Sequence, residues 1–143
     1  MTYLVATDGS AVSDLAIEHA AADAGMWERP LEIVHVLSAE AELINGELVL
    51  PGGDRAIERG RRTLADAREL ARSIANDHGA GIDIGTELLS GYPPEAITDR
   101  AEETGASRIY VGHRGLSEER EKVVGSVAKT VVDKASVPVS IVR

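Results

Sequence analysis

A glycine-rich segment near the C-terminal end of the chain has the residue types of a phosphate-binding loop. It follows the pattern G-x2-G-x9-G-S, whose fixed positions are Gly112, Gly115, Gly125 and Ser126. Glycine lets a backbone turn through otherwise forbidden dihedral angles and approach an anion closely, while N–H groups at the start of a following helix favour a phosphate. The hydroxyl of Ser126 adds a donor there. The segment predicts an anion site, against the simpler alternative that the glycines end a strand and the serine caps a helix.

A second candidate is the acidic residue Asp8, which ends an apolar run near the N-terminus. A carboxylate at this place could accept hydrogen bonds from ribose hydroxyls or help to hold Mg²⁺ through water. The tripeptide Asp8-Gly9-Ser10 is equally typical of an Asx turn, in which the aspartate binds the backbone two residues on. Both interpretations stay open from spacing alone.

The other polar residues of the glycine segment do not supply a catalytic group. His113 lies within the segment but has no partnered nucleophile, so no catalytic residue is predicted. The basic residues Arg114, Arg120 and Lys122 could neutralise phosphates. The alternative is a solvated loop of mixed charge, because three acidic residues lie among them, namely Glu118, Glu119 and Glu121.

Several familiar chemistries are not indicated. The four histidines have no metal-ligand spacing, and His35 lies in an apolar run where a hydrogen-bonded core imidazole is expected. The paired acidic residues of a phospho-accepting receiver domain are missing near Asp8, and no lysine follows a glycine loop as in a P-loop. The sequence therefore predicts no protein metal site, although Mg²⁺ could accompany a nucleotide near Asp8.

Strands and helices are predicted to alternate along the chain. Asn45-Gly46 between apolar residues favours a small hairpin in the long connection 38–54. Helices are expected from about 11, over 54–78, over 94–104 and from about 125, and strands over 3–7, 31–37, 82–89, 108–111 and 137–142. This alternation predicts one α/β domain, 1–143, with a doubly wound, mostly parallel five-stranded sheet in the order 3-2-1-4-5 and helices on both faces.

The predicted topology brings the two candidate sites together. In the order 3-2-1-4-5 the winding direction reverses between the first and fourth strands, and ligands bind beyond the carboxyl ends of the strands at that point. Asp8 follows the first strand and the glycine segment follows the fourth. Because three glycines and a serine converge there, the phosphate-loop interpretation becomes the stronger one.

Composition limits the class of partner. The formal net charge of −9 argues against a nucleic-acid partner, because a phosphate backbone would be repelled. Cysteine is absent, which is typical of a reducing compartment. The N-terminus has neither a basic region nor a long apolar stretch, so no signal peptide or membrane anchor is predicted, and a cytoplasmic location is expected.

The chain resembles the universal stress protein family over essentially its whole length. Four stretches carry the likeness: 5–10, 33–36, 91–97 and 111–142. The last is the most specific, because the nucleotide-binding branch of the family is marked by G-x2-G-x9-G-[ST], which Gly112, Gly115, Gly125 and Ser126 satisfy without insertion. His113 departs from the family, whose members more often carry serine or threonine there.

The resemblance implies a set of site residues for ATP, ADP or AMP. Asp8 would lie near the ribose, and Val36 would meet the adenine through its backbone. The acidic residues 118, 119 and 121 depart from the family pattern and would favour AMP or ADP over a triphosphate. The complete predicted set is Ala6, Thr7, Asp8, Val36, Val111, Gly112, Arg114, Gly115, Gly125, Ser126 and Val127.

The resemblance also implies a function and an assembly. Family members commonly form homodimers by pairing their last strands, and the strand from Val137 to Val142 would otherwise be an unprotected apolar edge. The leading hypothesis is a nucleotide-responsive stress protein, a binding module whose occupancy alters the 38–54 connection or a partner surface. One alternative is a slow ATPase or phosphotransferase, in which Asp8 positions Mg²⁺ and His113 or Arg114 stabilises the transferred phosphate. Another is a nucleotide-free dimeric scaffold, against which the intact glycine motif argues.

Overall fold

The computed structural model describes residues 1–143 except 39–41, 45, 50–52, 80 and 114–124. Within these residues, strands and helices alternate as the sequence predicts. The strands are β1 (Tyr3–Ala6), β2 (Leu31–Ser38), β3 (Glu42–Ile44), β4 (Glu47–Val49), β5 (Ile84–Gly91), β6 (Arg108–Gly112) and β7 (Val139–Val142). The helices are α1 (Ala11–Trp27), α2 (Asp54–Asp77), α3 (Pro93–Thr104) and α4 (Ser126–Lys134).

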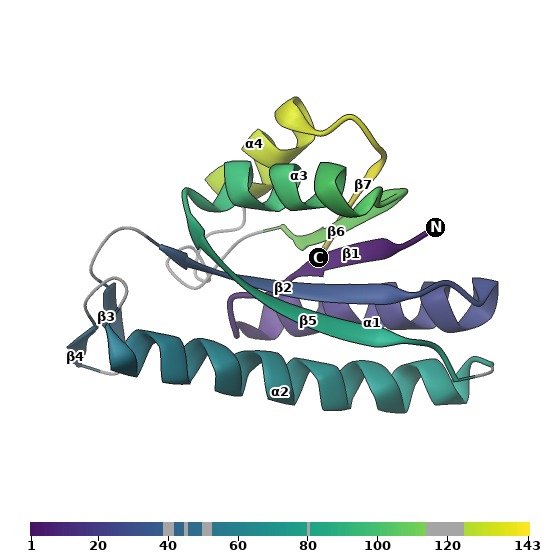
Figure 1. Ribbon diagram of the computed structural model, residues 1–143, viewed down its shortest axis with the longest axis horizontal. Coiled ribbons are helices and arrows are strands. Elements are labelled where there is room, and N and C mark those ends of the chain that lie inside the picture. Colours follow the sequence, from purple (N-terminus) through teal and green to yellow (C-terminus); the bar gives the residue numbers. More distant parts are fainter. Residues whose placement is uncertain (39–41, 45, 50–52, 80, 114–124) are drawn as a thin grey trace.

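The main sheet has five strands in the order β5-β2-β1-β6-β7, and all of its pairs are parallel. Numbered within this sheet alone, the order is 3-2-1-4-5, which confirms the predicted topology. Strands β3 and β4 form the predicted hairpin, which lies beside the start of α2 (Figure 1). The α/β fold class is therefore confirmed.

Two strands have boundaries that differ from the prediction by two residues, and each difference has an identifiable reason. Strand β5 runs over Ile84–Gly91 instead of 82–89, because it pairs residue by residue with the whole of β2, ending at Ser38 beside Gly91. Strand β7 begins at Val139, two residues later than predicted, because Pro138 has no N–H to donate and contributes only its carbonyl, which accepts from Ile109. Both boundaries are set by the neighbouring strand and not by local pattern.

The sheet is buried on both faces. Helices α1 and α2 cover one face, and α3 and α4 cover the other (Figure 1). Successive residues of β1 point into opposite clusters: Val5 packs under α1 and α2, whereas Leu4 packs under α3 and α4. Both side chains are fully buried, as expected for the central strand of a parallel sheet.

Helices α1 and α2 approach each other closely at a glycine. A Cβ atom on Gly25 of α1 would lie 2.7 Å from the carbonyl oxygen of Ala75 in α2 and 3.1 Å from its Cα. A Cβ atom on Gly79, just after α2, would lie 2.6 Å from the Gly25 carbonyl oxygen. Backbone therefore packs directly on backbone at this crossing.

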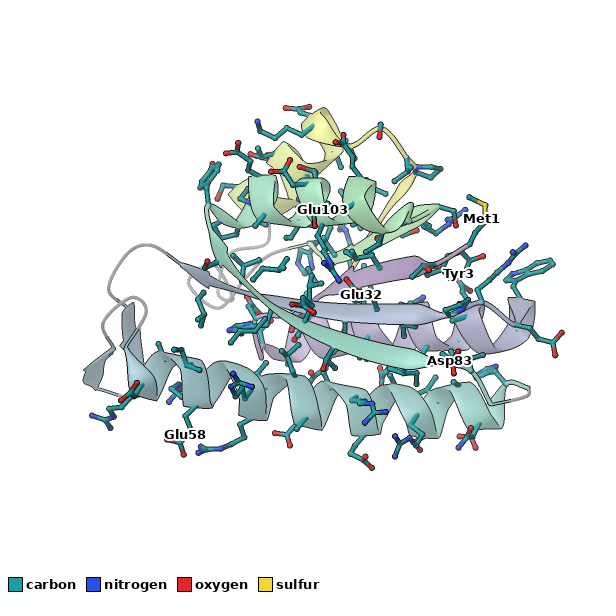
Figure 2. All side chains as sticks on the ribbon, in the orientation of Figure 1. Met1, Tyr3, Glu32, Glu58, Asp83 and Glu103 are labelled. Atoms are coloured by element: carbon teal, nitrogen blue, oxygen red, sulfur yellow. The ribbon has the colours of Figure 1, made fainter. Side chains whose placement is uncertain are left out.

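An ionic cluster joins α3 to the sheet. Arg100 donates two hydrogen bonds to Glu32 of β2, from Nε to Oε1 at 2.7 Å and from Nη2 to Oε2 at 3.0 Å. The carboxylates of Glu87 and Glu103 lie 3.8 and 3.5 Å from the same guanidinium. Figure 2 shows Glu32 and Glu103 on facing elements. The hydrogen bonds to Glu32 raise the pKa of Arg100 above its ordinary value, so this cation stays charged.

Tyr110 of β6 has a buried hydroxyl that donates to Asp23 of α1, with 2.6 Å between Oη and Oδ2. Its ring lies 5.9 Å from that of Tyr3 in a tilted arrangement.

Among the residues that the structure describes, no helix is both long and apolar enough to cross a membrane.

Candidate nucleotide-binding site

Those predicted site residues that the structure describes lie around the point where β1 and β6 end side by side. These strands pair in parallel from Tyr3 beside Arg108 to Val5 beside Tyr110, so their carboxyl ends lie at one edge of the sheet. The segment after β1 contains Thr7 and Asp8, and the segment after β6 begins at His113. The topological switch point therefore lies where the sequence places it.

The turn from β1 into α1 is held by a network of short polar contacts. Asp8 accepts a hydrogen bond from the Ser10 backbone N–H at 2.9 Å, which is the Asx-turn geometry. Ser10 is the N-cap of α1 and accepts from the Ser13 N–H at 3.1 Å. The Asx turn orients the Asp8 carboxylate, so the two interpretations left open by the sequence do not exclude each other.

Thr7 is the centre of this network. Its backbone N–H donates to Val34 of β2 at 2.9 Å, and its side-chain Oγ1 accepts from the Gly9 N–H at 3.1 Å. Ser13 donates its single hydroxyl proton to the Ser10 carbonyl at 2.9 Å, so the Thr7 hydroxyl must donate to Ser13 Oγ across 3.0 Å. Only 5% of Thr7 is exposed, and the turn is anchored from inside the protein.

The base of the glycine segment is closed by backbone hydrogen bonds. The His113 N–H donates to the Val142 carbonyl of β7 at 2.8 Å, and the Gly125 N–H donates to the His113 carbonyl. The chain that leaves the sheet after Gly112 therefore returns to the same point at Gly125. The fixed positions at the two ends of the motif are thus brought together, and the Gly125 N–H is engaged within the chain.

Helix α4 starts at this closed base. Gly125 is its N-cap, is buried, and has an extended backbone with φ −70° and ψ 164°. Ser126 is the exposed first residue of the helix, and Val127 follows it. The first N–H groups of a helix have no partner within it, and its N-terminus carries partial positive charge, so this end of α4 favours an anion. Arg114 and Gly115 lie outside the described residues.

The apolar members of the predicted set share one face of the sheet. Ala6, Val36 and Val127 pack against the cluster under α3 and α4, and Val111 is a buried member of that cluster. Val36 lies on β2 two residues beyond Val34, the partner of Ala6, and so lies closer to the carboxyl edge. Thr7, in contrast, bonds to Ser13 of α1 on the opposite face. The site residues thus lie on both faces of the sheet at its carboxyl edge.

The α1 side of the edge is negatively charged. Partial burial raises the pKa of Asp14 in the first turn of α1, and the nearby carboxylates of Glu18, Asp8 and Asp66 raise it further. This field works against the favourable charge of a helix N-terminus. A bare phosphate chain is therefore better accommodated beside α4 than beside α1.

The whole chain is similar in sequence to known proteins. The profile of the universal stress protein family matches residues 1–143. The universal stress protein YxiE of Bacillus subtilis is 32% identical over an alignment of 150 residues. This alignment covers 98% of this chain and 97% of the relative. This chain belongs to the universal stress protein family.

Two solved structures of this family with bound nucleotides share the fold. The universal stress protein from Archaeoglobus fulgidus in complex with dAMP is 27% identical and superposes with a TM-score of 0.75, covering 100% of this chain and 98% of that one. A universal stress protein in complex with cAMP is 25% identical with a TM-score of 0.73, covering 100% and 96%. The family assignment made from sequence motifs is confirmed.

Sequence reasoning missed two polar residues at the site of this universal stress protein. Ser10 and Ser13 form hydrogen bonds that hold the turn between β1 and α1. The sequence signal for the helix cap is the serine that comes directly before the first apolar residue of α1. The sequence predicts a hydrogen-bonded imidazole at His35, and the structure confirms the hydrogen bond. Its partner is the carbonyl of Thr7, 2.7 Å from Nδ1, which no local pattern reveals because 28 residues separate the two.

Proposed function

We propose that this universal stress protein binds an adenine nucleotide, ATP, ADP or AMP, at the edge between β1 and β6, and that occupancy regulates its contacts with partners. The observation that carries the proposal is the closed base of the glycine segment, where the Gly125 N–H meets the His113 carbonyl. This contact brings the two ends of G-x2-G-x9-G-S together beside the N-terminus of α4. The relatives solved with dAMP and cAMP support an adenine nucleotide as the ligand class.

Five of the predicted residues have specific roles in this proposal. Asp8 would accept hydrogen bonds from the ribose, and the Val36 backbone would meet the adenine. Ser126 and Val127 would donate to phosphates from the start of α4. Gly125 would act through its missing side chain, because its N–H is already donated to His113. Mg²⁺ bound with the nucleotide would offset the acidic field of Asp8 and Asp14, which favours Mg·ATP over bare ATP.

Mg·ATP is expected to raise the thermal midpoint of the wild type and to leave that of Gly125→Val unchanged. Ligand at about ten times its dissociation constant stabilises by roughly 1.4 kcal/mol, which corresponds to about 5 °C for a domain of this size. A valine side chain at Gly125 would occupy the buried point where the phosphates approach the backbone. The measurement is differential scanning fluorimetry on protein stripped of any nucleotide that co-purified.

The matched control is Gly85→Val on the exposed edge strand β5, where an added Cβ meets no heavy atom within 4 Å. This variant should keep the full shift. A Gly125→Val protein that binds Mg·ATP as tightly as the wild type would refute the site assignment. A wild type that shifts with none of ATP, ADP and AMP would favour the nucleotide-free scaffold.

The proposal includes a homodimer formed through β7. This strand is at one end of the sheet order, and 38% of Ile141 is exposed. The carbonyls of Pro138 and Val142 point to β6, where they accept from Ile109 and His113. Backbone groups alternate along a strand, so those of Val139 and Ile141 point outward. A second copy could pair with this edge.

Ile141→Pro is expected to convert the dimer to a monomer while preserving the fold, because it removes an outward N–H and no bond to β6. Multi-angle light scattering at micromolar concentration measures the mass, and Ile141→Val, which keeps the N–H and the apolar side chain, should remain dimeric. A wild type that is monomeric at that concentration would eliminate the dimer.

A further inference from the structure

His35 links strand β2 to the turn that carries Asp8. It lies on the same face of β2 as Ile33 and Leu37, and its half-buried imidazole is on the α2 side of the sheet. Its Nδ1 is 2.7 Å from the Thr7 carbonyl oxygen. A carbonyl oxygen can only accept, so Nδ1 must carry a proton whether the imidazole is neutral or charged. The hydrogen bond therefore assigns the neutral tautomer as Nδ1–H.

With this hydrogen bond, every polar group of Thr7 has a hydrogen-bond partner. The N–H of Thr7 is bound by Val34, its hydroxyl by Gly9 and Ser13, and its carbonyl by His35. The Thr7 carbonyl and the Asp8 N–H belong to one planar peptide unit. Fixing the carbonyl direction consequently fixes the plane from which Asp8 begins.

Helix α2 holds the imidazole in place. A Cβ atom on Gly60 would lie 3.1 Å from His35 Cδ2, so the helix backbone packs directly against the ring. Three residues later, the methyl group of Thr63 would lie 3.6 Å from a Cβ atom on Gly9. One face of α2 thus contacts both His35 and the turn that it orients.

We infer that His35 is a positioning residue of the nucleotide site. Its Nδ1–H sets the Thr7 carbonyl and with it the Asp8 turn, while Gly60 provides the space in which α2 supports the ring. The inference rests on the proposed function for its effect on nucleotide affinity. Its effect on the turn does not depend on that function.

Three substitutions separate the hydrogen bond from the volume of the side chain. His35→Asn retains a donor near the place of Nδ1, His35→Gln moves the donor toward the place of Nε2, and His35→Leu removes it at similar size. Calorimetric titration with Mg·ATP should show binding weakened about threefold to tenfold for Leu and Gln, the loss of one hydrogen bond, and within about twofold of wild type for Asn. His19→Leu, at an exposed position of α1, is the control and should bind as wild type.

Amide hydrogen exchange at Gly9 and Ser10 supplies a second measurement that needs no ligand. Both amides donate within the turn, to Thr7 Oγ1 and Asp8 Oδ1. They should exchange faster in His35→Leu and at the wild-type rate in His35→Asn, and nitrogen NMR of the wild type should show a proton on Nδ1.

The outcomes separate the two proposals. Equal weakening by Asn, Gln and Leu, or no weakening by any of them in a protein that binds Mg·ATP, would overturn the positioning role and leave the nucleotide site standing. If the wild type binds no nucleotide, the proposed function fails, and the exchange rates alone then decide whether His35 orients the turn.

Discussion

Replacing Gly25 with alanine is expected to lower the free energy of unfolding by about 2 to 3 kcal/mol, the usual cost of overpacking a core. A destabilising effect is unusual for this substitution, because in an exposed helix interior alanine is more stabilising than glycine by about 1 kcal/mol. Here the new methyl group would lie 2.7 Å from the Ala75 carbonyl oxygen and 3.3 Å from its carbonyl carbon. These are backbone atoms, so relief requires α1 and α2 to move apart.

The comparison variant is Gly60→Ala in α2. Its methyl group would lie 2.7 Å from Leu88 Cδ1 and 3.3 Å from Leu37 Cδ2, the ends of flexible side chains that can rotate away, and 3.1 Å from His35 Cδ2, which needs to shift by only a few tenths of an ångström. Gly60→Ala should therefore change the free energy of unfolding by less than about 1 kcal/mol. Urea titrations at constant m value measure both variants. Equal effects at the two positions would show that the α1 and α2 crossing is not limited by its backbone contact.

The stability of the protein is expected to fall steeply above pH 10 because of Tyr110. Burial, followed by the hydrogen bond to Asp23, raises the pKa of this phenol well above its ordinary value of 10.0. Between the ordinary and the raised pKa, the unfolded chain releases a proton that the folded protein retains. Folding stability therefore decreases as pH rises, by up to about 1.4 kcal/mol per pH unit, and by about 2 kcal/mol between pH 10 and pH 12. Below pH 10 this contribution is fully present.

Tyr110→Phe separates that contribution from other alkaline titrations. At pH 8 the variant should lose about 1 to 2 kcal/mol, because the Asp23 carboxylate loses its donor. Above pH 10 its stability should fall less steeply than that of the wild type, so the two curves converge. Tyr92→Phe is the control, since 59% of Tyr92 is exposed and its loss should leave the alkaline slope unchanged. Parallel curves for the wild type and Tyr110→Phe would contradict the buried-phenol account.

The sequence carried enough local signal to predict the order of elements. Alternating strand and helix patterns, with Gly105 ending α3 in a left-handed conformation at φ 66°, identify the α/β topology. That topology then places the segments after β1 and β6 at one edge. The return of the glycine segment to the end of β6 and the approximate place of Asp8 follow from this reasoning.

What could not be predicted depends on pairs that are distant along the chain. The Arg100 and Glu32 pair joins residues 68 apart, and the Gly25 and Ala75 contact joins two helices. His35 reads as an ordinary strand residue until Thr7 is seen beside it. The engagement of the Gly125 N–H depends on the direction in which the returning chain enters α4. Such contacts arise from tertiary packing, which residue spacing does not encode.

Strand β1 lies at the centre of the sheet and is synthesised first, but it cannot pair on both sides until β6 has been made. The first strand to be made pairs with residues 31–34 on one side and with residues 108–110 on the other. A nascent chain that ends before β6 therefore exposes one full edge of the central strand of the sheet. Non-local parallel pairing of this kind folds slowly and is vulnerable to aggregation while it is incomplete. The sheet can close around β1 only when about three quarters of the chain has left the ribosome.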